Sequence, residues 1–236
     1  MPIAQRRVLV VDDMMFVRQI VRKVLEVDPK IAVVGEAANA FEARQKIKQL
    51  KPDVVTLDIE MPDMRGDVFL KQIMTIRPLP VIMLSQSVAC GSPISAAAFA
   101  DGAVDCIEKP RNPNDITTQL FGDRLRQSVL GAYLPEQRLT QSVTPLKAPT
   151  FRWNGRYLFV GASTGGVAAM EQVFRDFPSN CPPVVVAQHI PSSFVSGLVE
   201  WLNARIAAQV LVARHGMELK TGQILVSPGG GRDVSI

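Results

Sequence analysis

The sequence predicts an α/β protein with two doubly wound units, each built around a parallel sheet. Short apolar runs such as "VLVV" and "PVVVAQ" do not alternate with polar residues, which is typical of strands buried on both faces. These runs alternate with stretches of helical period. Residues 135–150 contain three prolines and no sustained apolar period, which indicates a linker.

The first unit is predicted to contain five strands and five helices. We expect strands over 7–13, 31–37, 53–58, 80–85 and 104–110. We expect helices over 15–27, 40–50, 67–76, 94–102 and 114–132. We therefore place the first domain at 1–132 and the linker at 133–150.

The second unit repeats the same rhythm over 151–236. We expect strands over 156–162, 183–188 and 208–214, and an extended segment over 223–236. The helices are expected to run from Ser163 or Thr164 to Phe177 and over 193–206. This domain is expected to be an incomplete doubly wound parallel unit.

Composition and charge exclude some classes of function. The net charge is +4, but residues 1–110 are balanced, and the excess is spread as +2 over 111–150 and +2 over 151–236. No basic stripe forms, so we expect no nucleic-acid partner, and the second unit has strands where a helix-turn-helix would be needed. The apolar run after Arg6 and Arg7 is too short for a signal peptide or a membrane span. We expect a cytoplasmic protein without direct membrane insertion.

The three cysteines are not spaced as metal ligands. Cys90, Cys106 and Cys181 are an odd number in a chain for which we expect no export, so we interpret them as reduced, mostly buried thiols.

Polar residues stand at the ends of the predicted strands of the first unit. Asp12 and Asp13 end the first strand, Asp58 the third, Ser85 the fourth and Lys109 the fifth. The carboxyl ends of parallel strands share one edge, where ligands bind at the point of strand reversal. Three adjacent carboxylates repel one another, so Asp12, Asp13 and Asp58 are candidate ligands of Mg²⁺.

This set of residues suits phosphoryl transfer. Asp58 is the candidate nucleophile, and Lys109 with the metal would hold the equatorial oxygens. The Ser85 hydroxyl would bind the new phosphoryl group and pull its loop inward as a switch. The alternative is a set of solvated loop carboxylates and a surface lysine.

Through "VLVVDD", "LDIEMPDMRG", "MLSQS" and "IEKP", residues 6 to about 132 resemble the receiver domain of response regulators. The resemblance implies a flavodoxin-like fold and phosphorylation of Asp58 by a partner histidine kinase, with Asp12, Asp13 and Asp58 around Mg²⁺. Cys106 stands where such domains usually carry an aromatic residue that moves on activation. A cysteine is smaller and cannot make that movement.

The segment "VGASTGG" places Ser163 between a predicted strand and a predicted helix. It lacks the lysine of a Walker loop, and Ser163 occupies the second glycine position of the dinucleotide pattern. It does match G-x-S-x-G, the strand-turn-helix form of a nucleophile elbow.

A serine nucleophile needs a base, and the chain has only two histidines. His189 directly follows the strand "PVVVAQ" and is expected at the same sheet edge as Ser163. His215 follows the segment "VLVAR" and is expected in a polar turn. We predict His189 as general base, with a structural histidine as the alternative. Backbone amides beyond Thr164 would stabilise an oxyanion. The predicted chemistry is acyl transfer to water without a cofactor.

"GASTGG" and "QHIP", behind a receiver and a linker, resemble the chemotaxis protein-glutamate methylesterases. The family matches Ser163, Thr164 and His189 residue by residue. It implies hydrolysis of glutamate methyl esters in methylated chemoreceptors, glutamine deamidation, control by a chemotaxis histidine kinase, and an unphosphorylated receiver that covers the active site.

The family's triad also needs an aspartate. After His189 the only aspartate is Asp233, in a glycine-rich turn. Without an orienting carboxylate, turnover in serine hydrolases falls by on the order of 10⁴, so we expect this chain as given to be inactive. The alternative function is a non-catalytic receiver that acts as a phosphate sink or docking module.

Overall fold

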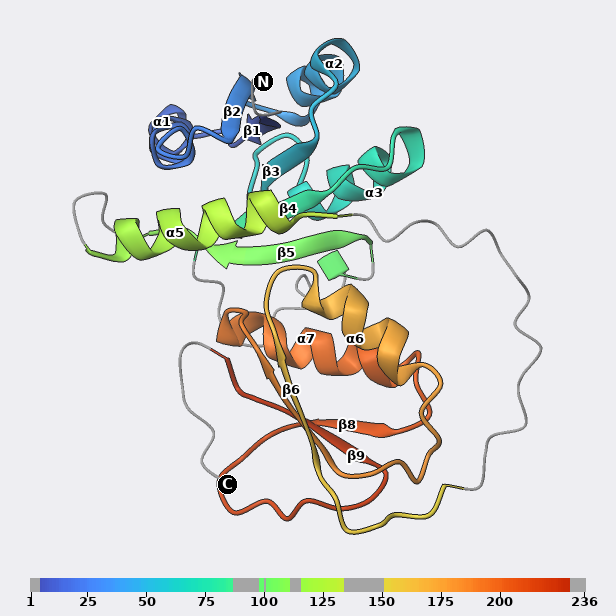
Figure 1. Ribbon diagram of the computed structural model, residues 1–236. Coiled ribbons are helices and arrows are strands. Elements are labelled where there is room, and N and C mark those ends of the chain that lie inside the picture. The colour runs from blue at the N-terminus through green and yellow to red at the C-terminus, as the bar shows by residue number, and fades with distance from the viewer. Residues whose placement is uncertain (1–4, 87–97, 100, 111–115, 134–150, 230–236) are drawn as a thin grey trace. The chain divides into compact units, whose positions relative to one another are not determined.

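The computed structural model describes residues 5–86, 98–99, 101–110, 116–133 and 151–229. Within them the chain forms two compact units, each with its own sheet (Figure 1). Every strand pairing in both sheets is parallel, and helices alternate with strands along the chain. The predicted α/β class is therefore confirmed.

The first sheet has five strands in the order β2-β1-β3-β4-β5. Its strands are β1 (Arg6–Val11), β2 (Ile31–Ala37), β3 (Val54–Asp58), β4 (Val81–Ser85) and β5 (Ala103–Glu108). The chain runs outward from β1 to β2, then returns past β1 to β3. This order puts the topological switch point between β1 and β3, where ligands bind in doubly wound sheets.

Four described helices cover this sheet. They are α1 (Met15–Leu25), α2 (Ala40–Leu50), α3 (Gly66–Ile76) and α5 (Ile116–Gly131). Asn39 caps α2, because its side chain accepts a hydrogen bond from the Glu42 amide. Of the helix predicted over 94–102, residues 98 and 99 are described as helical, and most of the remainder lies outside the described residues.

The core of the first unit forms where α1 and α5 pack on the sheet. Val8 and Val10 of β1 contact a cluster that includes Val21 and Leu25 of α1 and Leu125 of α5. The strands β3 and β4 are buried along their whole length. Burial of both strand faces explains why their sequences lack alternation.

The second sheet has four strands in the order β6-β7-β9-β8. Its strands are β6 (Leu158–Ala162), β7 (Val184–Gln188), β8 (Gln209–Val212) and β9 (Gln223–Val226), and its helices are α6 (Gly166–Phe174) and α7 (Ser192–Asn203). The final extended segment thus supplies β9, which lies between β7 and β8.

The predicted start of the helix after β6 is wrong by two to three residues. It was expected at Ser163 or Thr164, but α6 begins at Gly166 because Gly165, its N-cap, has a φ of +75°. A left-handed residue cannot belong to a right-handed helix. The helix also ends at Phe174 instead of Phe177.

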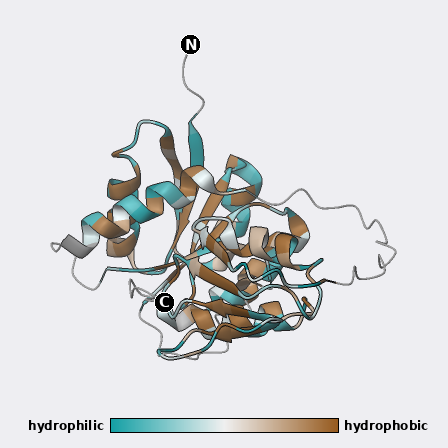
Figure 2. Ribbon diagram, turned by 60° about the horizontal axis from the view of Figure 1, so that its bottom comes forward, coloured by the Kyte–Doolittle hydropathy of each residue, from teal (hydrophilic) through white to brown (hydrophobic). Residues whose placement is uncertain are grey.

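Exposure differs between the two sheets. Along β6, exposed residues alternate with half-buried ones, and Phe159 is 58% exposed. Gly161 pairs in register with Ala187 of β7, and both are exposed. Figure 2 shows the strands mostly in the hydrophobic colours, whereas the helices carry both hydrophobic and hydrophilic residues. One face of β6 is therefore open to solvent, unlike the strands of the first sheet.

No helix in the described ranges combines the length and the apolar character that crossing a bilayer requires.

Candidate functional site

Asp12, Asp58 and Lys109 meet at the carboxyl edge of the first sheet. Lys109 Nζ lies 2.6 Å from Asp12 Oδ2 and 2.8 Å from Asp58 Oδ1. All three side chains are almost fully buried. The structure therefore brings together residues separated by about a hundred positions, as the strand-end pattern predicted.

Backbone groups orient the two buried carboxylates. Asp12 Oδ1 accepts a hydrogen bond from the Met14 amide at 3.0 Å, and Asp58 Oδ1 accepts one from the Glu60 amide at 3.2 Å. Burial raises the pKa of Asp12, Lys109 opposes that rise, and the nearby Asp58 carboxylate adds to it. The site thus holds closely spaced carboxylates that require a positive partner.

Asp13 completes an oxygen-only group that fits a divalent cation. One carboxylate oxygen from each of Asp12, Asp13 and Asp58 lies within 4.8 Å of the others, and Asp13 is more exposed than its two partners. Such a set, with one side open to water, has the donor chemistry that Mg²⁺ prefers.

Ser85 is the last residue of β4 and is buried beside this edge. Its carbonyl accepts a hydrogen bond from the Lys109 amide at 2.7 Å. Its hydroxyl Oγ has no hydrogen-bond partner among the described residues. A buried hydroxyl without a partner is costly, so this position is suited to an incoming oxygen ligand.

Arg18 supports the acidic loop and was not singled out by the sequence analysis. Its Nη1 donates to the carbonyls of Asp12 at 2.8 Å and Asp13 at 3.1 Å, while its Nε pairs with Glu36 at 3.3 Å. The loop after β1 is thereby tied to β2. An arginine on an amphipathic helix gives no distinctive sequence signal.

Cys106 lies within a buried polar network on β5. The neighbouring Asp105 accepts hydrogen bonds from Arg124 at 2.7 and 2.9 Å, from Ser128 at 2.6 Å and from the Cys106 amide at 2.9 Å. Burial raises the pKa of the Cys106 thiol well above its usual range, and Asp105 adds to that effect. The thiol is therefore protonated and packs as a small apolar group. In the sequence, Asp105 is an acidic residue inside the mostly apolar run "AVDCIE", and this exception could have indicated a buried polar network.

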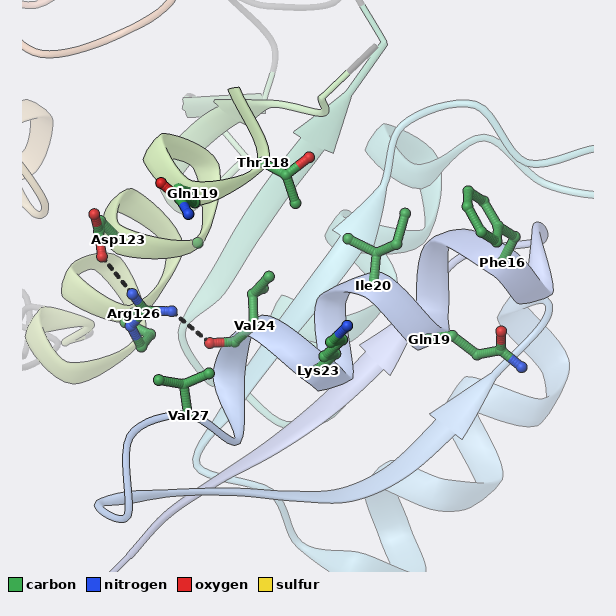
Figure 3. A pocket seen from close by; sticks show the side chains of 11 residues that line it. Phe16, Gln19, Ile20, Lys23, Val24, Val27, Thr118, Gln119, Asp123 and Arg126 are labelled. Atoms are coloured by element: carbon green, nitrogen blue, oxygen red, sulfur yellow. Dashed lines mark hydrogen bonds and ion pairs between the residues drawn. The ribbon is translucent and has the colours of Figure 1, made fainter. Parts of the chain in front are cut away.

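A groove lies between α1 and α5 of the first unit (Figure 3). Phe16 of α1 and Val27, just after the end of α1, line it. Arg126 of α5 donates to the Val24 carbonyl at 2.6 Å. No predicted site residue lines it.

Ser163 and His189 occupy equivalent positions in the second sheet. Ala162 pairs in register with Gln188, and Ser163 and His189 are the next residues of the two parallel segments. The His189 amide donates to the Ala162 carbonyl at 3.0 Å. Adjacent strands lie about 4.8 Å apart, so the backbones of the two residues are neighbours. Both residues are exposed.

The turn that carries Ser163 differs from a strained nucleophile elbow. Lys51 is the only described residue other than glycine with a positive φ, so Ser163 does not adopt the strained conformation of such an elbow. The left-handed position in this turn is Gly165. Thr164 lies within the same turn and is half-buried.

The other candidates in the second unit lie elsewhere. His215 follows β8, and β8 is separated from β6 by β9 and β7. Asp233 lies outside the described residues.

Two family models match this chain. The "Response regulator receiver domain" matches residues 8–121, and the "CheB methylesterase" model matches residues 158–235. The structure is similar to the response regulator domain of Thermotoga maritima CheB, with a TM-score of 0.50 and 40% identity over 54% of this chain and 96% of that one.

Curated relatives match almost the whole chain. It is 44% identical to a protein-glutamate methylesterase/protein-glutamine glutaminase of Agrobacterium fabrum, over 99% of this chain and 68% of that protein. It is 43% identical to the corresponding protein 1 of Rhizobium johnstonii, over 99% of this chain and 67% of that protein. The chain therefore belongs to the protein-glutamate methylesterases of the response regulator class, which are carboxylic ester hydrolases.

Proposed function

We propose that this protein is a phosphorylation-regulated enzyme that hydrolyses glutamate γ-methyl esters of chemoreceptors in the cytoplasm. The observation that carries the catalytic part is the parallel register of Ala162 with Gln188, which supports a shared role for Ser163 and His189. We assign 1–132 to the receiver, 133–150 to the linker and 151–236 to the esterase part.

In the receiver, Asp58 is the proposed acceptor of a phosphoryl group from a chemotaxis histidine kinase. An Asp58 oxygen would attack phosphorus in line while the P–N bond to the kinase histidine breaks. Lys109 would hold the phosphoryl oxygens, and the Ser85 hydroxyl, which has no partner within the described part of the chain, would gain one. A Mg²⁺ ion held by Asp12, Asp13 and Asp58 would supply positive charge against the transferred group.

In the esterase part, Ser163 Oγ would attack the ester carbonyl carbon while His189 accepts its proton. His189 would return that proton to the departing methoxide, which leaves as methanol. Water would then cleave the acyl-enzyme and release glutamate. Attack on a glutamine side chain would release ammonia by the same steps, as the glutaminase name of the relatives suggests. No cofactor enters this chemistry, and the proposal assigns no described residue to the carboxylate that orients the imidazole.

The receiver part is tested by labelling with acetyl phosphate. We expect Mg²⁺-dependent labelling of the wild type and none of Asp58→Asn, because the amide cannot form an acyl phosphate. Equal labelling of the two proteins would contradict the assignment of Asp58.

The esterase part is tested with a fluorophosphonate and mass spectrometry. We expect covalent modification at Ser163, with a rate that falls by about 10² in His189→Gln because the base is lost. Methanol release from methylated receptor, compared with Ser163→Ala, measures turnover. We expect this chain to turn over slowly, lower by on the order of 10⁴ than with an orienting carboxylate, because the proposal assigns no described residue to that role. Labelled Asp58 together with an unreactive Ser163 would favour the alternative, a phosphate sink or docking module.

A further inference from the structure

Gln188 is a buried amide at the turn that carries Ser163. It is the last residue of β7, directly before His189, and only 4% of it is exposed. Its Nε2 donates to the Ser163 carbonyl at 2.9 Å. The same carbonyl accepts a hydrogen bond from the Gly166 amide at 2.8 Å. The backbone carbonyl oxygen of Ser163 therefore accepts hydrogen bonds from two different segments of the chain.

The orientation of the Gln188 amide follows from its partner. A carbonyl oxygen only accepts hydrogen bonds, so the amide nitrogen must face Ser163, and Oε1 must face away from it. Oε1 then points at the first residue of α6, since a Cβ added to Gly166 would lie 2.3 Å from it. Oε1 has no hydrogen-bond partner among the described residues.

This arrangement explains two features of the sequence. Gly166 lacks a Cβ because the Gln188 amide and the Ala162 Cβ occupy that space. A polar residue ends an otherwise apolar strand because only a side chain with a donor reaches the Ser163 carbonyl. A buried amide whose oxygen has no partner among the described residues costs stability, and this amide lies beside the two segments that carry Ser163 and His189.

We propose that Gln188 is a positioning residue, which fixes the backbone of Ser163 so that its hydroxyl stays within reach of His189. The proposal rests on the proposed roles of Ser163 and His189. In this role Gln188 acts through the Ser163 carbonyl, and the proposal assigns it no part in the chemical steps. His189 follows Gln188 directly and is anchored to Ala162, so one strand end holds both partners.

The test compares Gln188→Met with Asn203→Leu in the full chain. Each substitution removes a side-chain amide at nearly constant volume. Asn203 is a matched control because it also bonds a backbone in this unit: its Nδ2 donates to the Val210 carbonyl at 2.9 Å and its Oδ1 accepts from the Val210 amide at 2.8 Å. The measurement is amide hydrogen exchange at Gly166, with thermal unfolding recorded in parallel.

We expect Gln188→Met to lower the protection of the Gly166 amide by about tenfold relative to Asn203→Leu. A merely structural role would change both variants through global stability alone. Unchanged protection in Gln188→Met, or the same loss in both variants, overturns the proposal.

Gln188→Glu provides a conservative variant, which also decides the question if Gln188→Met fails to fold. A protonated carboxyl can donate to the Ser163 carbonyl, whereas a carboxylate cannot. Protection of Gly166 should therefore return as pH falls through the pKa of the introduced group. A protection factor that follows the wild type across that range overturns the proposal.

Reaction of Ser163 with a fluorophosphonate separates this inference from the function on which it rests. We expect Gln188→Met to react about tenfold more slowly than Asn203→Leu. Failure of the wild type to react contradicts the assigned role of Ser163, while the exchange measurement still judges whether Gln188 holds the turn.

Discussion

The two candidate sites are held in place by different forces. At the edge of the first sheet, buried carboxylates and Lys109 attract one another over 2.6 to 2.8 Å. At the edge of the second sheet, exposed side chains are placed by strand register and by hydrogen bonds to backbone carbonyls. Charges fix side-chain positions in the first site, whereas main-chain pairing sets the backbone positions of Ser163 and His189 in the second. Substitutions in the first site should therefore change the free energy of unfolding. Substitutions in the second site should change mainly the local order of the turn that carries Ser163.

The largest effect is expected for Lys109→Met. The substitution leaves Asp12 and Asp58 buried without their cation, and breaking such a pair costs about 3 kcal/mol. Urea unfolding at pH 7 without Mg²⁺ measures the loss. Lys220→Met serves as the control, because its pair with Glu218 is largely exposed and worth little. Equal stability of the two variants would show that the buried charges do not hold the first site.

Gly66→Ala and Gly161→Ala compare how tightly the two sites are packed. A Cβ at Gly66 would lie 1.9 Å from the Asp58 carbonyl oxygen, whereas a Cβ at Gly161 meets nothing within 4 Å. We expect a loss of about 2 kcal/mol for Gly66→Ala and a change within about 0.5 kcal/mol for Gly161→Ala. Thermal unfolding distinguishes them, and a larger loss at Gly161 would reverse the comparison.

Glu36→Gln tests the charged support of the first site. Burial raises the pKa of Glu36, but Arg22 and Arg18 lower it more, so its net pKa lies below 4.5. A lowered pKa stabilises the folded state above pH 4.5, and this contribution is lost as pH falls through the folded-state value. We expect the variant to lose about 1.5 kcal/mol at pH 7, and this loss to shrink as pH falls below 4.5. Urea unfolding at pH 7 and over a series of pH values below 4.5 measures this, and a pH-independent difference would contradict the pairing.

The smallest effects concern two left-handed residues, Gly165 in the second unit and Lys51 in the first. Gly165 has a φ of +75° and Lys51 a φ of +47°. Gly165→Ala should cost about 1 kcal/mol, and Lys51→Gly should stabilise by about 0.5 kcal/mol because glycine relieves the strain of that conformation. Calorimetry of both variants checks the opposite signs.

The sequence allowed the first site to be predicted more fully than the second. Asp12, Asp58, Ser85 and Lys109 could be placed because strand ends in a parallel sheet share an edge. The contacts of Arg18 depend on side-chain reach across the sheet, which no local pattern encodes.

In the second unit, strand identity was predictable but the conformation of the turn was not. The segment "STGG" offers two glycines as left-handed candidates, and only packing decides between them. Gly165 adopts that conformation, while Gly166 lies against Gln188. The start of α6 was therefore misplaced, although the positions of Ser163 and His189 at one edge followed from the strands.

The pairing of β6 with β7 limits how this gene can tolerate insertions and deletions. Loss of one codon within β7 would displace the imidazole by about 3.3 Å along the strand and turn it to the opposite face. The same loss between Phe174 and Val184, in the connection from α6 to β7, leaves the pairing unchanged. Natural length variation around the proposed catalytic pair should therefore be confined to that connection.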